Sequence, residues 1–252
     1  AKNALDYSRM KKIILLLVTI SVLNTGWAQE NESKKVKPST PSPDFPGSLV
    51  LEYGLNYFYE NSYEMRTNPW KSATINVYYT YPVQILESRF SFNPGVGVGN
   101  EKFGFESSVS FVDSANLTVM KPITELARFD TLMTFKQTQL VANYIDIPME
   151  FRVHTRKSDH KRSWYLAVGG KIGFNFDAKT KIKYQEFGRS KTYKDKYHWN
   201  VNSFRYGGLV RIGLGPVNAW VYVSGSKLFR GNKSINMVNP TMWSFGLAIA
   251  TF

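Results

Sequence analysis

An apolar side chain at every second position is the feature of this chain that most restricts its fold. In the first such run, Leu49, Leu51 and Tyr53 alternate with Glu52 and Gly54. Successive side chains of a β-strand point to opposite faces, so a period of two predicts strands with one apolar and one polar face. We count eight such runs before the chain ends and therefore predict an all-β protein.

The composition of the polar face distinguishes a membrane barrel from a soluble sandwich. The second face of a soluble sheet is solvated and rich in Lys, Glu and Thr, whereas here it carries Gly, Ser, Asn and isolated charges. Small and polar side chains suit the crowded interior of a narrow barrel. Each run also matches the roughly 9–11 residues that a tilted strand needs to cross a bilayer. We predict an eight-stranded antiparallel transmembrane up-and-down β-barrel with long extracellular loops.

The connections between the runs alternate in length. The long ones span residues 60–71, 100–139, 177–202 and 231–240, and the short ones span 82–88, 155–163 and 215–216. Long extracellular loops and short periplasmic turns are the pattern of outer-membrane barrels. The alternation predicts an outer-membrane location with a periplasmic N-terminus.

Two positions break the alternation. Phe103 and Phe105 have the opposite parity to Val98, so we expect a β-bulge near residues 99–100. Phe252 falls on the opposite parity to the apolar residues of the last run. We interpret it as a terminal insertion signal, through which the last strand meets the barrel-insertion machinery.

The N-terminal segment has the features of a secretory signal. Lys11 and Lys12 precede an apolar stretch of residues 13–23, and Gly26 and Ala28 offer small residues before a cleavage site. The stretch is too short to span a core of about 30 Å. We assign residues 1–28 to a signal peptide with upstream residues, 29–47 to a disordered periplasmic linker rich in Lys, Ser and Pro, and 48–252 to the barrel.

Composition limits the chemistry. The chain has no Cys, which excludes disulfides, thiolate catalysis and Fe–S clusters. Its net charge of +13 invites a nucleic-acid interpretation, but much of the charge lies in the signal, the linker and two connections near residues 156–162 and 179–196. We expect no nucleic acid. The loop charge is either solvated or attracted to lipopolysaccharide phosphates, which makes outer-membrane lipid an expected partner.

The segment 144–151 resembles the strand motif of the PorT-like outer-membrane β-barrel family, through Tyr144, Asp146 and Pro148. An aromatic and Gly-containing strand at 164–176 and a Gly-rich strand at 206–213 are similar to that family too. The resemblance covers about residues 48–252 and implies an eight-stranded barrel. For some members it further implies a part in the type IX secretion and gliding apparatus. The extended second loop departs from the compact members.

The inward parity collects ionisable side chains, which we expect to form an interlocked ion network in the lumen. The predicted set is Glu52, Asp146, Glu150, Arg89, Arg152, Lys171, Arg205 and Arg211. Its net charge of +2 leaves two interpretations open, a structural filling of the barrel and a narrow path for anions. Pro148 points inward and removes one ladder hydrogen bond, so we expect a bulge there.

No pattern of catalytic or metal-ligating residues stands out. His154 and His160 fall at the periplasmic end, and His198 lies in the third long loop with Ser203 near it. Neither a Gly-x-Ser-x-Gly nor a His-Glu-x-x-His motif supports a nucleophile or a metal. We expect no catalytic residue, no metal and no cofactor.

Aromatic residues of the first and third long loops form either an interfacial girdle or a contact surface for a partner. We favour a non-enzymatic interaction or scaffold component with envelope protein partners, which the resemblance would place in a type IX secretion or gliding assembly. A small-solute channel is the alternative, and an outer-membrane lipid-modifying enzyme is the third candidate.

Overall fold

The computed structural model describes residues 47–59, 65–86, 88–114, 117–126, 133–156, 163–197, 199–231, 234–235 and 239–251. The proposed signal peptide, almost all of the proposed linker, His160, His198 and Phe252 lie outside the described residues.

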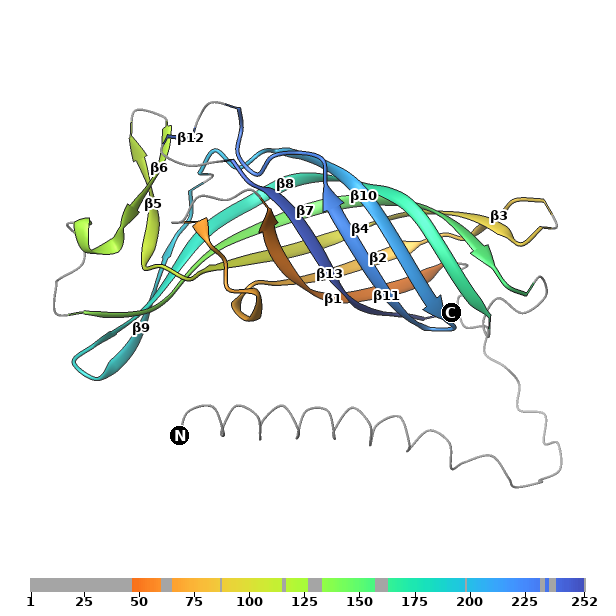
Figure 1. The fold of residues 1–252 in the computed structure, drawn as a ribbon, viewed down its shortest axis with the longest axis horizontal. Helices are drawn as coiled ribbons and strands as arrows, with labels where there is room; N and C mark the ends of the chain where they lie inside the picture. Colours follow the sequence, from red (N-terminus) through yellow and green to blue (C-terminus); the bar gives the residue numbers. More distant parts are fainter. Residues whose placement is uncertain are drawn as a thin grey trace, which may run out of the picture. The chain divides into compact units, whose positions relative to one another are not determined.

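Eight antiparallel strands close into one barrel (Figure 1). The strands follow one another around the ring in chain order, and β13 pairs with β1 to close it. They are β1 (Ser48–Tyr59), β2 (Ala73–Thr80), β4 (Phe90–Phe105), β7 (Thr134–His154), β8 (Trp164–Glu186), β10 (Phe204–Leu214), β11 (Val217–Ser224) and β13 (Thr241–Ala250). The predicted up-and-down barrel is confirmed.

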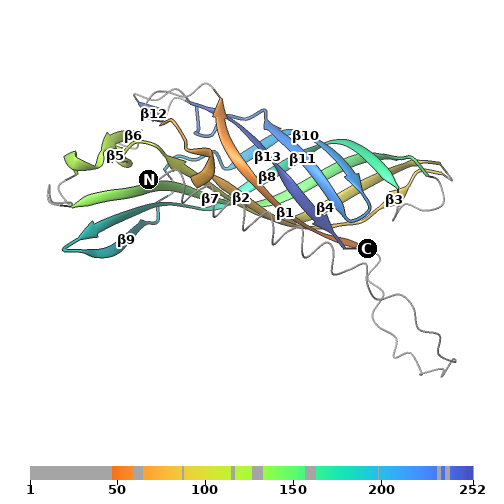
Figure 2. The ribbon, with the colours of Figure 1, turned by 60° about the horizontal axis from the view of Figure 1, so that its bottom comes forward.

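The smaller elements gather at the two ends of the barrel. Figures 1 and 2 show β5 (Val109–Ser114), β6 (Leu117–Pro122), β9 (Arg189–Asp195) and β12 (Ser234–Ile235) at one end, which we call the long-connection end. β3 (Val83–Gln84) lies at the opposite, short-connection end. Two 3₁₀ turns, Pro69–Lys71 and Ile123–Glu125, lie in long connections. β5, β6 and β12 form a separate small sheet, and β9 pairs with β8 as a projecting ribbon.

The barrel has the opposite polarity to a soluble protein. Apolar side chains of every strand stand on the outer face, where Leu247 is 64% exposed. Polar and charged side chains lie inside, where Asp146 is fully buried. Two large aromatic side chains of β11, Trp220 and Tyr222, also point into the barrel, where both are buried. Among the described residues, no helix has the length and apolarity that a membrane crossing requires.

The predicted bulge near residues 99–100 is wrong. β4 keeps one continuous register with β7 up to Phe105, and Phe103 and Phe105 are buried inside. Apolar side chains change faces because the filling of the barrel turns from polar to aromatic towards the long-connection end. The register shifts occur between β7 and β8 instead, and at one of them Phe176 is an extra residue of β8 between Asn175 and Asp177.

The predicted bulge at Pro148 is also absent. The register between β4 and β7 is the same on both sides of Pro148, and the pairs that would involve Pro148 and Ile147 are missing. The strand therefore accommodates the lost N–H by interrupting the ladder locally instead of by adding a residue.

Candidate functional site

In the part of the chain that the structure describes, eight charged side chains are buried in the lumen, and their charges balance. Four carboxylates and four cations are involved: Glu52, Glu101, Asp146, Glu150, Arg152, Lys171, Arg205 and Arg211. Arg89 is not among them, because it is exposed in the turn before β4. Glu101 was assigned to a loop in the sequence, but β4 continues through it and directs it inward. The expected lumen charge of +2 is therefore wrong.

The first charge layer lies towards the short-connection end and is centred on Arg211. Its guanidinium lies 2.5 Å from Glu52 and 2.9 Å from Glu150, and it donates to Asn218 at 2.6 Å. Arg152 pairs with the second oxygen of Glu150 at 2.9 Å. Asn218, on β11, is not part of the predicted ion network, because that prediction includes only charged side chains.

Hydrogen bonds from β2 complete the first layer. Asn76 donates to the free oxygen of Glu52 at 2.8 Å, and Thr74 donates to Asn76 at 3.1 Å. Both oxygens of each carboxylate therefore have partners, which is the condition under which buried ions are tolerated.

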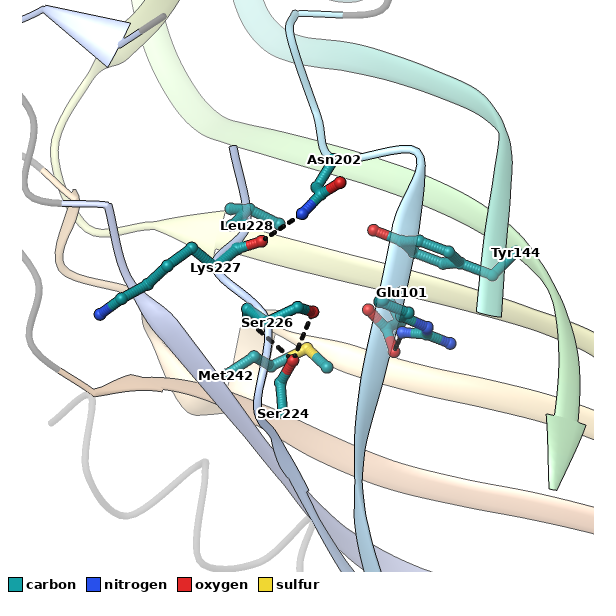
Figure 3. Close-up of a pocket in the computed structure, with 9 residues that line it drawn as sticks. Glu101, Tyr144, Asn202, Ser224, Ser226, Lys227, Leu228 and Met242 are labelled. Carbon is teal, nitrogen blue, oxygen red and sulfur yellow. Dashed lines mark hydrogen bonds and ion pairs between the residues drawn. The ribbon is translucent and has the colours of Figure 1, made fainter. Parts of the chain in front are cut away.

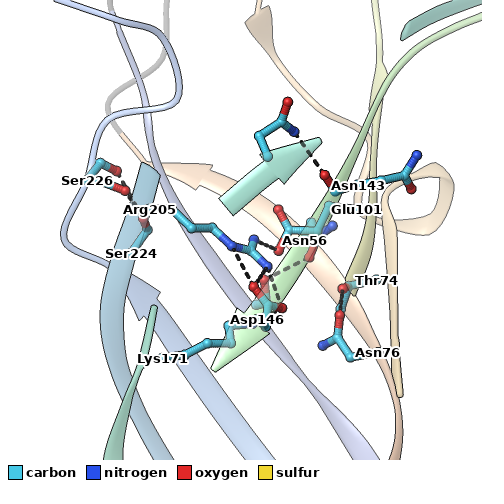
Figure 4. Close-up of polar contacts among 12 residues, drawn as sticks. Asn56, Thr74, Asn76, Glu101, Asn143, Asp146, Lys171, Arg205, Ser224 and Ser226 are labelled. Carbon is cyan, nitrogen blue, oxygen red and sulfur yellow. Dashed lines mark hydrogen bonds and ion pairs between the residues drawn. The ribbon is translucent and has the colours of Figure 1, made fainter. Parts of the chain in front are cut away.

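The second charge layer lies closer to the long-connection end and is centred on Arg205 (Figure 4). Arg205 donates three hydrogen bonds to Asp146, at 2.8, 2.9 and 3.3 Å, and makes a further ion pair with Glu101. The ring of Tyr144 lies under the guanidinium, 3.7 Å from its central carbon. The Tyr144 and Asp146 positions of the strand motif thus meet around one arginine.

Lys171 is enclosed by aromatic rings and one carboxylate. Its Nζ lies 3.8 Å from Asp146, donates to the Tyr78 hydroxyl at 3.3 Å, and lies 4.1 Å from the centre of the Tyr222 ring. Tyr78 in turn donates to Asp146 at 2.9 Å. The two tyrosines take the place of the water that a lysine would otherwise require.

Glycine makes room for the second layer. A Cβ added at Gly173 would lie 2.3 Å from Asp146 Oδ1 and 2.6 Å from Arg205 Nε. The Gly content of the inward face therefore has a specific use at this position, since it lets a guanidinium lie against the barrel wall.

A small cavity separates the second layer from the long-connection end (Figure 3). It has a volume of about 20 Å³, enough for roughly one water molecule. It is lined by Glu101, Tyr144, Asn202, Arg205, Ser224, Ser226, Lys227, Leu228 and Met242. A cavity of this size holds no solute larger than water.

An aromatic cap closes the lumen beyond the cavity. We define the cap as Phe105, Phe111, Trp199 and Phe229, all buried. Phe111, on β5, lies 5.7 Å from Phe105, 5.9 Å from Trp199 and 5.7 Å from Phe229, measured between ring centres. Below it, Phe58 and Phe103 stack at 4.5 Å. The cap joins the end of β4 to three different long connections in one packed cluster.

The loop aromatics thus divide into two groups. Trp199 is buried in the cap, whereas Trp70 is 81% exposed. An interfacial girdle would place both outside, so Trp199 does not belong to one. The only sequence feature that indicates the cap is the change of parity at Phe103 and Phe105.

The histidine and serine candidates do not meet in the described part of the chain. His154 is buried at the short-connection end, with Nδ1 3.2 Å from the Ser163 hydroxyl. Ser203 accepts a hydrogen bond from Arg230 at the other end. No group of three or more His, Cys, Asp or Glu that could hold a metal ion occurs among the described residues.

Comparisons with known proteins give one family. The model of the outer membrane protein beta-barrel domain matches residues 27–229. No curated protein matches the chain. Among solved structures, the chain is similar to Ail, the attachment invasion locus protein of Yersinia pestis, at 12% identity and a TM-score of 0.34. The alignment covers 81% of this chain and 97% of that chain. A structure of Ail in complex with the heparin analogue sucrose octasulfate gives 15% identity, a TM-score of 0.35 and the same coverage.

Proposed function

Because the chain belongs to the outer membrane protein beta-barrel domain family, we propose that it is a non-enzymatic outer-membrane component that binds an envelope partner through its long-connection end. In this proposal the N-terminus is periplasmic and the long connections face the cell exterior, as in barrels with this loop pattern.

The sealed lumen is the observation that carries the proposal. The four carboxylates are paired with the four cations, and the aromatic cap covers them. A barrel of eight strands has an interior that side chains fill, so little is left in the lumen to bind or transport a solute. The surface that is then available for a specific task is the one that the long connections present at the long-connection end.

The assembly to which the partner belongs is a further part of the proposal. The segment around Tyr144, Asp146 and Pro148 resembles the strand motif of PorT-like barrels, some of which take part in type IX secretion and gliding. Tyr144 and Asp146 both contact Arg205. These two motif positions therefore have a structural role, because the contact stabilises the barrel. We therefore propose a type IX secretion or gliding component as the first partner to test.

The channel alternative makes a different electrical prediction. With a cavity of about 20 Å³ between the second charge layer and the aromatic cap, we expect planar bilayers that contain the folded barrel to show no conductance steps. If purified protein shows regular conductance steps, the protein is a channel and the proposed interaction role is wrong.

The lipid-modifying enzyme is the third candidate, and no catalytic group among the described residues supports it. We therefore expect a deletion strain to have an unchanged lipid A profile.

Orientation is tested first, because the natural chain has no Cys and each introduced thiol is unique. Trp70→Cys marks the long-connection end and Gln84→Cys marks the short-connection end; both positions are exposed. In intact cells, a membrane-impermeant maleimide should label the first variant and not the second. Labelling of Gln84→Cys alone would reverse the proposed topology.

The partner is tested by photo-crosslinking from the same two positions. A photoreactive amino acid at Trp70 should capture a discrete protein in outer membranes, and the same amino acid at Gln84 serves as the matched control. Tyr197 is an exposed residue of another long connection. Capture of the same protein from Tyr197 would support a partner surface formed by more than one long connection. If neither long-connection position captures a protein while both variants fold, the interaction role is wrong.

A further inference from the structure

Five lysines form a patch on the outer face of the barrel wall at the long-connection end. The lysine patch consists of Lys102 on β4, Lys179, Lys181 and Lys183 on β8, and Lys194 on β9. After the extra residue Phe176, the odd positions of β8 face outward, because Ala178, Thr180 and Ile182 are buried inside.

Strand pairing brings the five cations together. Lys181 lies directly opposite Lys194 in the register of β8 and β9. Lys102 and Lys179 flank Val141 in the same row of β4, β7 and β8. Val141 shares the outward parity but is only 1% exposed, so it is covered by its neighbours. The patch is therefore a continuous surface across three strand pairs.

The patch is under-neutralised. Asp177 accepts from Lys179 at 2.7 Å and from Asn143 at 2.6 Å, which offsets one of the five charges. Like charges directly opposite each other destabilise a sheet. Partial burial lowers the pKa of Lys181, and the neighbouring lysines Lys179, Lys102, Lys194 and Lys183 lower it further. An anion over these side chains would remove the repulsion.

The level of the patch on the barrel indicates where such an anion comes from. Phe174 and Phe176 stand outward on β8 just below it, and Phe174 packs against Phe204 at 5.4 Å. Outward aromatic residues mark the boundary of the hydrocarbon core. At about 3.3 Å per residue and a tilt of about 45°, Lys179 and Lys181 lie roughly 7–12 Å beyond Phe176 along the membrane normal. That distance matches the headgroup layer.

We propose that the lysine patch binds the phosphate groups of a phosphorylated glycolipid in the leaflet at the long-connection end. The lipid is the source of the phosphate because the apolar face of β7 and β8 continues directly below the patch and offers its acyl chains a surface. Polybasic clusters at a membrane surface bind anionic lipid in this way. The inference rests on the proposed orientation only for the identity of the leaflet, and it is independent of the protein partner.

The test uses the detergent-folded full barrel and bis-phosphorylated lipid A as the probe. The variant carries Lys181→Gln, Lys183→Gln and Lys194→Gln. Each cation near a membrane surface contributes about five-fold to affinity, so we expect the dissociation constant to rise on the order of a hundredfold. The matched control removes the same charge at exposed positions outside the patch, with Lys121→Gln, Arg156→Gln and Arg189→Gln, and should bind as the natural chain does.

Two further probes separate the sources of phosphate. Dephosphorylated lipid A should bind weakly to the natural chain, and free pyrophosphate should compete poorly because it brings no acyl chains. The inference is overturned if the patch variant binds lipid A normally, if the control loses as much affinity, or if pyrophosphate alone binds as tightly as the lipid. Crosslinking from Trp70 measures the protein partner separately, so a failed lipid experiment with intact crosslinking would leave the proposed function standing.

Discussion

Arg211 and Glu150, which are 61 residues apart in the chain, form a 2.9 Å ion pair across the lumen. The pair ties β10 to β7 past the intervening β8, and both side chains are 2% exposed. Backbone pairing holds each strand to its two neighbours, so contacts of this kind are what connect strands that do not touch through the ladder.

Replacing Arg211 with Leu should destabilise the barrel by about 3–5 kcal/mol, because Glu52 and Glu150 are then left as buried charges without their common partner. The midpoint of urea unfolding in detergent, followed by heat-modifiable gel mobility, measures the loss. Arg152→Leu should cost less, about 1–3 kcal/mol, because Glu150 keeps Arg211. Equal stability of the two variants would contradict the layered network.

Replacing Gly173 with Ala should destabilise by about 1–3 kcal/mol, since the added methyl would lie 2.3 Å from Asp146 and 2.6 Å from Arg205. Gly208 is the matched control on the outer face, where an added Cβ meets nothing within 4 Å. The unfolding midpoint of Gly208→Ala should equal or exceed that of the natural chain. If Gly173→Ala leaves the unfolding midpoint unchanged, the stability of the barrel does not depend on close packing of Arg205 against position 173.

Replacing Phe111 with Ala should loosen the aromatic cap without unfolding the barrel. Phe111 joins Phe105, Trp199 and Phe229, and a buried Phe→Ala substitution removes about 3–5 kcal/mol of packing. We expect faster proteolysis within residues 106–133 and an unchanged heat-modifiable shift. Phe187→Ala, at a position 93% exposed, is the control and should change neither measurement. Loss of the barrel itself would show that the cap is part of the folding core.

Asp177 should titrate below the usual range for a carboxyl group. The hydrogen bond from Lys179 lowers its pKa most, the hydrogen bond from Asn143 lowers it further, and partial burial opposes them. A carboxyl group with a lowered pKa in the folded state stabilises that state above its unfolded pKa, and this contribution is lost as the pH falls through the lowered value. An NMR titration of labelled Asp carboxyl carbons measures it. Asn143→Ala should move the pKa back towards its ordinary value, and no movement would show that the hydrogen bond is absent in solution.

How far the sequence predicts the lumen is seen by comparing Arg89 with Glu101. Both have the same parity in the sequence, but the alternation predicts Arg89 in the lumen and places Glu101 in the long connection 100–139. β4 begins at Phe90 and runs to Phe105, so Arg89 lies outside the barrel wall and Glu101 lies within it. Parity gives the face on which a side chain stands, but only the length and register of the paired strand give its depth.

The cap shows the same limit at the level of packing. Phe111, Trp199 and Phe229 come from three separate connections, and nothing local in those segments indicates that they meet. The parity change at Phe103 was visible, but a bulge and a change in lumen filling produce the same pattern. Closure of the barrel decided between them, because only then is the upper lumen a space that apolar side chains can fill.

The sequence by itself determined the strands, their inner and outer faces, their number and the order of long and short connections. These properties follow from a period of two and from turn length, which neighbouring residues encode. The tertiary structure alone decided which ions pair, that their charges balance, and that an aromatic cluster seals one end. Those outcomes depend on contacts between residues tens to hundreds of positions apart. Such contacts form only when the barrel closes through the pairing of β13 with β1.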